Sequence, residues 1–283
     1  MSKRILISNA HLKDIGGSEL VAVELAEEYA QRGWHVELYS PLIGEPLKST
    51  IHPSVIVTDK FPDLITRWDI IWDHHGTLMP YVEKRKGTIL VANHMSSYVD
   101  AEKPKYAPGK PDRIFANSPE TIESMAPAYR ERAELFQNPA PRGWHKNMVS
   151  GESAMFISKH RPRELEAIIG TLEIPCVVHN GDRRIHRADF NNARFVVCNG
   201  KSVQYAMCAG VPVFVYDSFG GPGWLTEENF ELTGYYNFSG RGFSKGAAVL
   251  ESLFAYATAK PVPDKLVNWR FKLHEWLYYN ELV

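Results

Sequence analysis

Short apolar runs and amphipathic stretches alternate along the chain, with glycine or proline between many of them. Residues 4–9 form an apolar run of the length typical of a buried parallel strand. A glycine loop follows, and apolar positions then recur with a helical period over residues 18–33. Residues 34–40 form a second apolar run. This order of strand, glycine turn, helix and strand predicts a βαβ unit.

The same alternation continues through most of the chain and predicts an α/β protein with mostly parallel strands. In the first half it predicts strands at 55–60, 69–76 and 88–94, a strand that passes into a helix over 112–121, and a short strand from residue 134. In the second half it predicts strands at 154–158, 174–180, 194–200 and 211–217, helices at 161–173 and 201–210, a glycine-rich loop at 218–223 and an aromatic helical tail at 263–283.

The periodic pattern is interrupted once, near the middle of the chain. Proline, glycine and asparagine replace it over residues 138–150, which is the composition of a connection between domains. We therefore predict two α/β domains, residues 1–145 and 146–264, and a separate C-terminal helix at 265–283.

Composition fits this organisation and excludes several classes of protein. The chain has 283 residues, 44% of them hydrophobic, a length that suits about two domains. Lys and Arg number 32 against 33 Asp and Glu, whereas a dedicated nucleic-acid binder usually carries a basic excess. The sequence lacks a signal-peptide core and a long apolar stretch. We expect a cytoplasmic protein, and peripheral association with the inner face of a membrane stays open.

Ligands of parallel α/β sheets bind beyond the carboxyl ends of the strands, so the residues directly after each strand are candidates for function. Gly16 and Gly17 lie between the first strand and the first helix. There they let the backbone approach a ligand beside the unpaired N–H groups of a helix N-terminus. A simple tight turn explains the two glycines as well. The GxGxxG pattern of dinucleotide-binding proteins is absent.

Histidines gather at the ends of two predicted strands. Asp73, His74 and His75 end one of them, and His94 ends the next along the chain. Because histidine titrates near neutral pH, these side chains can act as a general base or hold a sugar hydroxyl. We take His94 as the first candidate and His75 as the second. The alternative is that each histidine only caps a strand or packs. The spacing offers no clear third or fourth zinc ligand, so we predict no metal site.

Gly200, Lys201 and Ser202 open the helix that follows the strand at 194–200. A glycine turn, a cation and a hydroxyl at a helix N-terminus form a cradle for a diphosphate. The P-loop pattern is absent, which argues against a typical ATPase. The alternative is an ordinary helix cap with an exposed lysine.

Other basic and glycine residues lie at the same predicted edge of the second sheet. Arg161 and Arg183 each follow a predicted strand. Either one alone is typical of a solvated surface, but their convergence favours a contact with phosphate. Gly220 and Gly221 follow the strand at 211–217, where glycine indicates a sharp bend or a close approach to a ligand.

Five segments together carry a resemblance to a known family: RILISNAHLKDIGGSELVAVELAEEYAQRGWHVELYS, DIIWDHHG, ANH at 92–94, DRIFANSPET and QYAMCAGVPVFVYDSFGG. They resemble segments of the GT-B glycosyltransferases, especially of their large family-four-type group. They occur in the family's order and span residues 4–221.

The resemblance implies a GT-B fold, with two Rossmann-like domains whose parallel sheets face each other across a cleft. It places the acceptor on the N-terminal domain (1–145) and a nucleotide-sugar donor on the C-terminal domain (146–264), and it implies that the helix at 265–283 crosses back to the first domain. It implies no metal and no cofactor besides the nucleoside-diphosphate sugar, which is a co-substrate. The residues expected to bind the donor are Gly200, Lys201, Ser202, Gln204, Arg161, Arg183, Gly220 and Gly221.

The sequence departs from the family pattern at two carboxylates. The family's retaining members carry two glutamates separated by seven residues, and these positions are Val197 and Tyr205 here. We expect Gln204 or Ser202 to replace the ribose contact that the second glutamate makes, and the stereochemical outcome stays open. Residues 224–243 have no counterpart in the family. Candidate substrate contacts in that segment are Asn237, Ser239 and Arg241.

We therefore expect a metal-independent glycosyltransferase that moves a hexose or related sugar to a hydroxyl of a glycan, a lipid-linked glycan or a similar acceptor, as in polysaccharide biosynthesis. In this hypothesis His94 is the base or a sugar contact, with His75 behind it, and Gly16 and Gly17 border the cleft. Two alternatives remain, a nucleotide-sugar 2-epimerase-like enzyme and a catalytically inactive GT-B-like binding subunit. The charge balance does not favour a nucleic-acid acceptor, and the oligomeric state stays open.

Overall fold

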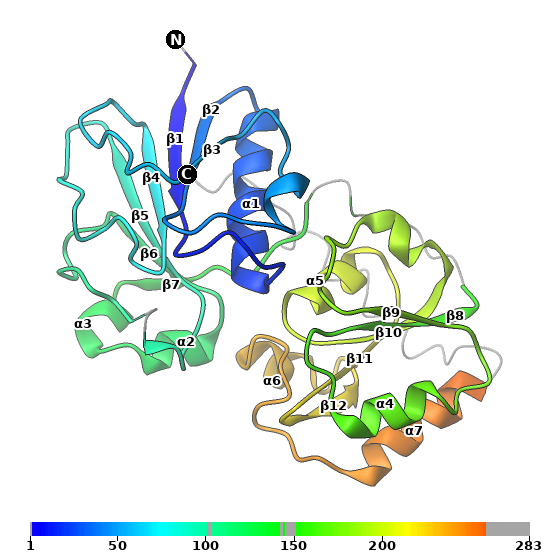
Figure 1. The fold of residues 1–283 in the computed structure, drawn as a ribbon. Helices are drawn as coiled ribbons and strands as arrows, with labels where there is room; N and C mark the ends of the chain where they lie inside the picture. Colours follow the sequence, from blue (N-terminus) through cyan, green and yellow to red (C-terminus); the bar gives the residue numbers. More distant parts are fainter. Residues whose placement is uncertain (1, 101–102, 142–143, 145–150, 259–283) are drawn as a thin grey trace. The chain divides into compact units, whose positions relative to one another are not determined.

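The computed structural model describes residues 2–100, 103–141, 144 and 151–258 (Figure 1). The chain divides into two compact units, Met1–Gln137 and Asn138–Val283. The domain boundary predicted at residues 145–146 and the C-terminal helix predicted at 265–283 both lie outside the described residues.

Unit 1 (Met1–Gln137) is built on a parallel sheet of seven strands in the order β3-β2-β1-β4-β5-β6-β7. The strands are β1 (Arg4–Ser8), β2 (His35–Tyr39), β3 (Ile56–Thr58), β4 (Ile70–His74), β5 (Ile89–His94), β6 (Arg113–Ala116) and β7 (Ala133–Leu135). Each was predicted from its apolar run. Strand β1 pairs in parallel with β2 on one side and with β4 on the other, so the strand order reverses between β1 and β4. Polar residues after these two strands therefore lie where such sheets bind ligands.

Helix α1 (Gly17–Gln31) connects β1 to β2 and packs a continuous row of buried residues against the sheet, including Leu20, Val23 and Leu25. It ends before Gly33, whose positive φ of 80° stops the helix. The other described helices of this unit are short: η1 (Lys48–Thr50), α2 (Pro119–Ser124) and α3 (Pro127–Arg130). Within the described part of the chain, the connection from β4 to β5 contains no helix.

Unit 2 (Asn138–Val283) contains a five-stranded sheet in the order β12-β11-β10-β8-β9. Its strands are β8 (Ser153–Ile157), β9 (Cys176–His179), β10 (Ala193–Cys198), β11 (Val213–Asp217) and β12 (Gly220–Trp224), and its helices are α4 (Arg163–Ile169), η4 (Arg187–Asn192), α5 (Lys201–Cys208), α6 (Phe230–Tyr235) and α7 (Ala247–Thr258). Helices α4 and α7 lie side by side (Figure 1) and contribute to one apolar core with Phe156, Phe195 and Phe214.

The glycine-rich loop predicted at 218–223 is wrong in part, because most of it forms strand β12, antiparallel to β11. Glycine fits there since the two strands approach closely. A Cβ atom added to Gly221 would lie 2.1 Å from the carbonyl oxygen of Val215, and one on Gly220 would lie 2.6 Å from that of Ser244. The close approach that these glycines permit is therefore to the protein's own backbone.

Replacing Gly221 by alanine should destabilise unit 2 by about 3 kcal/mol, because a methyl group in this position forces the two strands apart. Urea unfolding followed by circular dichroism measures the change. Gly109→Ala is the matched control, because a Cβ there meets nothing within 4 Å. Equal stability of the two variants would contradict the close packing of β11 on β12.

Candidate functional site

Buried polar residues end four neighbouring strands of the unit 1 sheet. Because these strands are parallel, their carboxyl ends meet at one edge. All the residues concerned are 6% exposed or less: Ser8, Asn9, Asp73, His74, His75, Asn93, His94, Asn117 and Ser118. The structure therefore brings the predicted strand-end histidines together, and it buries them.

Asp73 organises the centre of this edge through hydrogen bonds. Its carboxylate accepts from the Ser8 hydroxyl (2.5 Å) and from the backbone N–H groups of Leu78 (2.9 Å) and Met79 (2.7 Å). Burial raises the pKa of Asp73 to about 6, although these hydrogen bonds act in the opposite direction. Asp73 thus ties β1 and β4 to the turn that follows β4, a structural role.

His74 and His75 are held in the neutral state by the same burial. The pKa of His75 is lowered to about 4, first by desolvation and then by repulsion from His11 and His94. Desolvation also holds the pKa of His74 well below its usual value. His75 has a positive φ of 62°, which turns the chain sharply at the end of β4. A neutral His75 can accept or donate one hydrogen bond, but burial restricts its access to a ligand.

Replacing His75 by asparagine should reduce the acid sensitivity of the protein. The unfolded chain takes up a proton on this histidine below pH 6.5, whereas the folded chain does so only near pH 4. Stability that is present above pH 6.5 is therefore lost as the pH falls toward 4, by about 3 kcal/mol. Asparagine tolerates the positive φ and does not titrate. Urea unfolding of both proteins at pH 7 and 4.5 measures the difference, and parallel losses of stability would contradict it.

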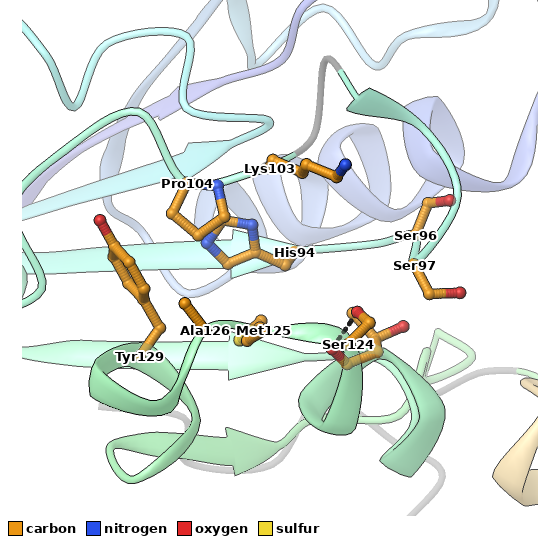
Figure 2. Close-up of a pocket in the computed structure, with 10 residues that line it drawn as sticks. His94, Ser96, Ser97, Lys103, Pro104, Ser124, Met125, Ala126 and Tyr129 are labelled. Carbon is orange, nitrogen blue, oxygen red and sulfur yellow. Dashed lines mark hydrogen bonds between the residues drawn. The ribbon is translucent and has the colours of Figure 1, made fainter.

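His94 lines a pocket of about 420 Å³ at the carboxyl ends of β5 and β6. Figure 2 shows its ring beside Pro104, with Met125 below it, Ser124 below and to the right, and Tyr129 further to the left, beyond Pro104. Nε2 of His94 lies 2.6 Å from the hydroxyl of Tyr106. The remaining lining residues are Ser96, Ser97, Lys103, Thr121 and Ala126. Hydroxyl groups beside apolar surface suit a neutral polar molecule such as a sugar.

Gly16 and Gly17 were predicted to let the backbone approach a ligand, but Gly16 lies against a side chain of the protein itself. A Cβ on Gly16 would lie 2.6 Å from Oε2 of Glu19, so Gly16 makes room for that carboxylate. Gly17 begins α1. Oε1 of Glu19 in turn lies 2.8 Å from Nε2 of His11. Our sequence reasoning missed both residues, although a polar residue in the strand–helix loop and an acidic residue in the first helical turn are both visible in the sequence.

In unit 2, Gly200 forms a sharp turn at the start of α5, as predicted. Its φ of 56° and ψ of −133° are accessible to glycine, and its N–H donates to the carbonyl oxygen of Phe238 (2.8 Å). A Cβ on Gly200 would meet no described atom within 4 Å. The backbone here faces open space beside a helix N-terminus, where N–H groups and the helix dipole favour an anion. Ser202 is half-buried on the first turn of α5.

Lys201 and Gln204 are more deeply buried than the sequence indicates. The ammonium group of Lys201 donates to the carbonyl oxygen of Pro139 (2.7 Å) and lies 4.8 Å from the ring centre of Tyr205. With its amide oriented to donate, Gln204 contacts the carbonyl oxygens of Gly200 and Lys201 at 3.0 Å. The Gln204 side chain therefore supports the turn at Gly200. Tyr205, at the position of a family glutamate, stacks on Trp144 with ring centres 4.2 Å apart.

The two predicted arginines follow β8 and β9 at the same edge of the sheet as Gly200, and each is paired within unit 2. Arg161 donates to Glu166 (2.7 Å) and to the carbonyl oxygen of Ser158 (3.1 Å). Arg183 forms a bidentate pair with Asp189, at 2.8 and 2.9 Å. These contacts hold the two guanidinium groups in place. To bind a phosphate, Arg161 or Arg183 must use N–H groups beyond those that its present acceptors occupy, or share them with these acceptors.

The segment without a family counterpart forms α6 and a turn beside Asp217. The N–H of Gly240 and the side chain of Asn199 both donate to Oδ2 of Asp217, at 2.9 and 3.1 Å. Burial lowers the pKa of Arg241 to about 10, still fully charged at neutral pH. The other two candidates make local contacts: Asn237 accepts from Asn138 (3.4 Å) and Ser239 accepts from the N–H of Arg241 (3.3 Å). Through Gly240, the end of this segment thus lies at the carboxyl end of β11, the edge of the sheet that carries Gly200.

The two α/β units have the fold of GT-B glycosyltransferases, as the similarity to solved structures shows. A glycosyltransferase involved in avilamycin A biosynthesis, AviGT4, is 15% identical over 97% of this chain and 93% of its own, with a TM-score of 0.53. An α-glucosyltransferase in complex with UDP and a 13-mer DNA containing an HMU base is 12% identical over 98% and 95%, also with a TM-score of 0.53. At these identities the likeness shows the fold alone.

Three further findings complete the comparison. A scan against protein-family models gave no match, and neither did a sequence search of curated proteins. None of the helices in the described ranges is long and apolar enough to cross a bilayer. Across those same ranges, no three His, Cys, Asp or Glu side chains are grouped so that they could hold a metal ion.

Proposed function

We propose that this protein is a glycosyltransferase that moves a sugar from a nucleoside diphosphate to a hydroxyl acceptor. The observation that carries the proposal is the similarity over nearly the whole chain to GT-B glycosyltransferases, one of which was solved with UDP and DNA. The turn at Gly200 adds independent support, because the space beside it is open and lies next to the N-terminus of α5. We infer a UDP-sugar as the donor.

In this proposal the leaving diphosphate binds at the start of α5. The N–H groups of Lys201 and Ser202 belong to the first turn of α5, where a helix supplies no carbonyl acceptors of its own, and they can donate to the diphosphate. The buried ammonium group of Lys201 adds positive charge near this turn. These groups stabilise the charge that develops as the bond from the anomeric carbon to the phosphate oxygen breaks. Arg161, Arg183 or Arg241 supplies a further cation. The reaction then requires no bound metal.

The acceptor binds at the edge of unit 1, in the pocket that His94 lines. Its hydroxyl oxygen forms the new bond to the anomeric carbon, the diphosphate leaves with the electron pair of the old bond, and the hydroxyl proton passes to a base or to the departing phosphate. We assign His94 a contact to the acceptor or the sugar. The near-zero net charge gives no reason to favour a polyanionic acceptor, so glycans and other neutral polyols come first.

A thermal-shift screen tests the donor site. UDP, GDP, CDP, ADP and TDP are added separately to the full chain, and the melting temperature is measured. One diphosphate, expected to be UDP, should raise it by mass action. A folded protein that responds to none of the five would contradict the proposed donor site and favour the binding-subunit alternative.

A further inference from the structure

The loop from β1 to α1 places a histidine against a glutamate at the carboxyl edge of the unit 1 sheet. Nε2 of His11 lies 2.8 Å from Oε1 of Glu19. The side chain of His11 is 41% exposed, whereas that of Glu19 is 6% exposed. The Ser18 hydroxyl donates to the other carboxylate oxygen (2.6 Å). Glu19 lies in the first turn of α1, where the helix dipole stabilises its negative charge.

Backbone contacts fix this pair in position. The N–H of Leu12 donates to the carbonyl oxygen of Leu42 (2.7 Å), and the N–H of Gly44 donates to that of Leu12 (3.0 Å). These two hydrogen bonds hold the backbone of Leu12, the residue after His11, against residues 42–44. Gly16 leaves the space that the Glu19 carboxylate occupies. The orientation of the His11 ring is therefore set by residues that are themselves held.

His11 differs from the other histidines at this edge in its access to solvent. His74, His75 and His94 are at most 6% exposed. The ring centre of His11 lies 6.3 Å from that of His75, so it belongs to the same cluster. A molecule that arrives from solvent can reach the His11 ring without displacing buried side chains.

We propose that His11 binds the reacting hydroxyl of the acceptor and that Glu19 positions His11 for this contact. This inference rests on the glycosyltransferase function proposed above. A carboxylate oxygen 2.8 Å from Nε2 favours a proton on that nitrogen, and in neutral histidine the lone pair is then on Nδ1. Among the described atoms, Nδ1 of His11 makes no hydrogen bond. Nδ1 accepts the hydrogen bond of the hydroxyl and directs an oxygen lone pair toward the anomeric carbon.

Release of UDP from UDP-glucose, with water as the acceptor hydroxyl, tests the proposal without an identified acceptor. The variants are His11→Ala, Glu19→Gln and the double variant. His52→Ala is the control, because the His52 side chain is exposed and its hydrogen-bonding partner is Ser54, two positions later. We expect His11→Ala to lower the rate of UDP release at least tenfold while the Kd for UDP, measured by calorimetry, stays within twofold. Glu19→Gln should lower the rate about threefold, and the double variant should be no slower than His11→Ala.

The outcomes separate this inference from the function on which it rests. Equal rates for His11→Ala and an active wild type would overturn the role of His11 and leave glycosyl transfer intact. If the fold-loss in rate of the double variant equals the product of the two single fold-losses, Glu19 does not act through His11. Failure of the wild type to bind or turn over any nucleotide sugar would instead overturn the proposed function and the inference with it. If His11→Ala melts at a lower temperature, His11→Gln replaces it and the same rates are compared.

Discussion

Replacing Gly200 by alanine should lower the affinity for UDP about 30-fold. The backbone at Gly200 has a positive φ, and the space beside it is open. A methyl group would occupy the space in which the diphosphate approaches the start of α5, and the strained turn would misdirect the N–H groups of Lys201 and Ser202. Loss of one hydrogen bond to a charged group is worth about 2 kcal/mol, which corresponds to about 30-fold. Isothermal titration calorimetry with UDP measures the effect.

A second glycine separates backbone strain from ligand binding. Gly87 also has a positive φ, of 87°, and a Cβ there meets nothing within 4 Å. Gly87→Ala should therefore lower stability by an amount similar to Gly200→Ala, about 1–3 kcal/mol, without changing the affinity for UDP. If both variants bind UDP like the wild type, the start of α5 is not the diphosphate site.

Replacing His94 by alanine should lower kcat/KM for the acceptor about 100-fold and leave the Kd for UDP unchanged. His94 is 2% exposed and contributes its ring to the wall of the acceptor pocket, so its loss removes a hydrogen-bonding group and leaves a cavity. Steady-state kinetics with the acceptor that the wild type glycosylates fastest measures the change.

Tyr106→Phe is the matched control for His94. It removes the hydroxyl that lies 2.6 Å from Nε2 of His94 but keeps the ring that packs in the unit 1 core. We expect a loss of at most tenfold in kcat/KM from this variant. Full activity of His94→Ala would contradict both the contact to the acceptor and the earlier hypothesis that His94 is a base.

The fold could be predicted from the sequence because strand and helix periods are read locally. The runs at 4–9 and 88–94 became β1 and β5 with changes of at most one residue at each end. The segment at 218–223 was predicted incorrectly in part, because glycine is typical of loops and nothing local shows that residues 220–223 pair with β11. The pairing depends on a close approach between strands, which glycine permits and sequence pattern does not reveal.

The candidate site could be predicted only as far as strand ends identify it. A histidine that ends a strand can point into the core or out to solvent, and periodicity does not distinguish the two for His75 or His94. The pair of Arg183 with Asp189 spans a turn rather than a helical repeat, so its spacing gives no signal. His11 was missed because its importance comes from Glu19, eight positions later, after the chain has turned at Gly16.

Product analysis with UDP-glucose tests the central claim most directly. The wild-type protein is incubated with UDP-glucose and, in separate reactions, with p-nitrophenyl glycosides or an oligonucleotide containing a hydroxymethylated base, and the products are identified by mass spectrometry. The account predicts release of UDP together with an acceptor that carries one added hexose. An isomerised nucleotide sugar formed without any acceptor would identify an epimerase. Unchanged UDP-glucose in every reaction, from a folded protein that also fails to bind UDP, would contradict glycosyl transfer.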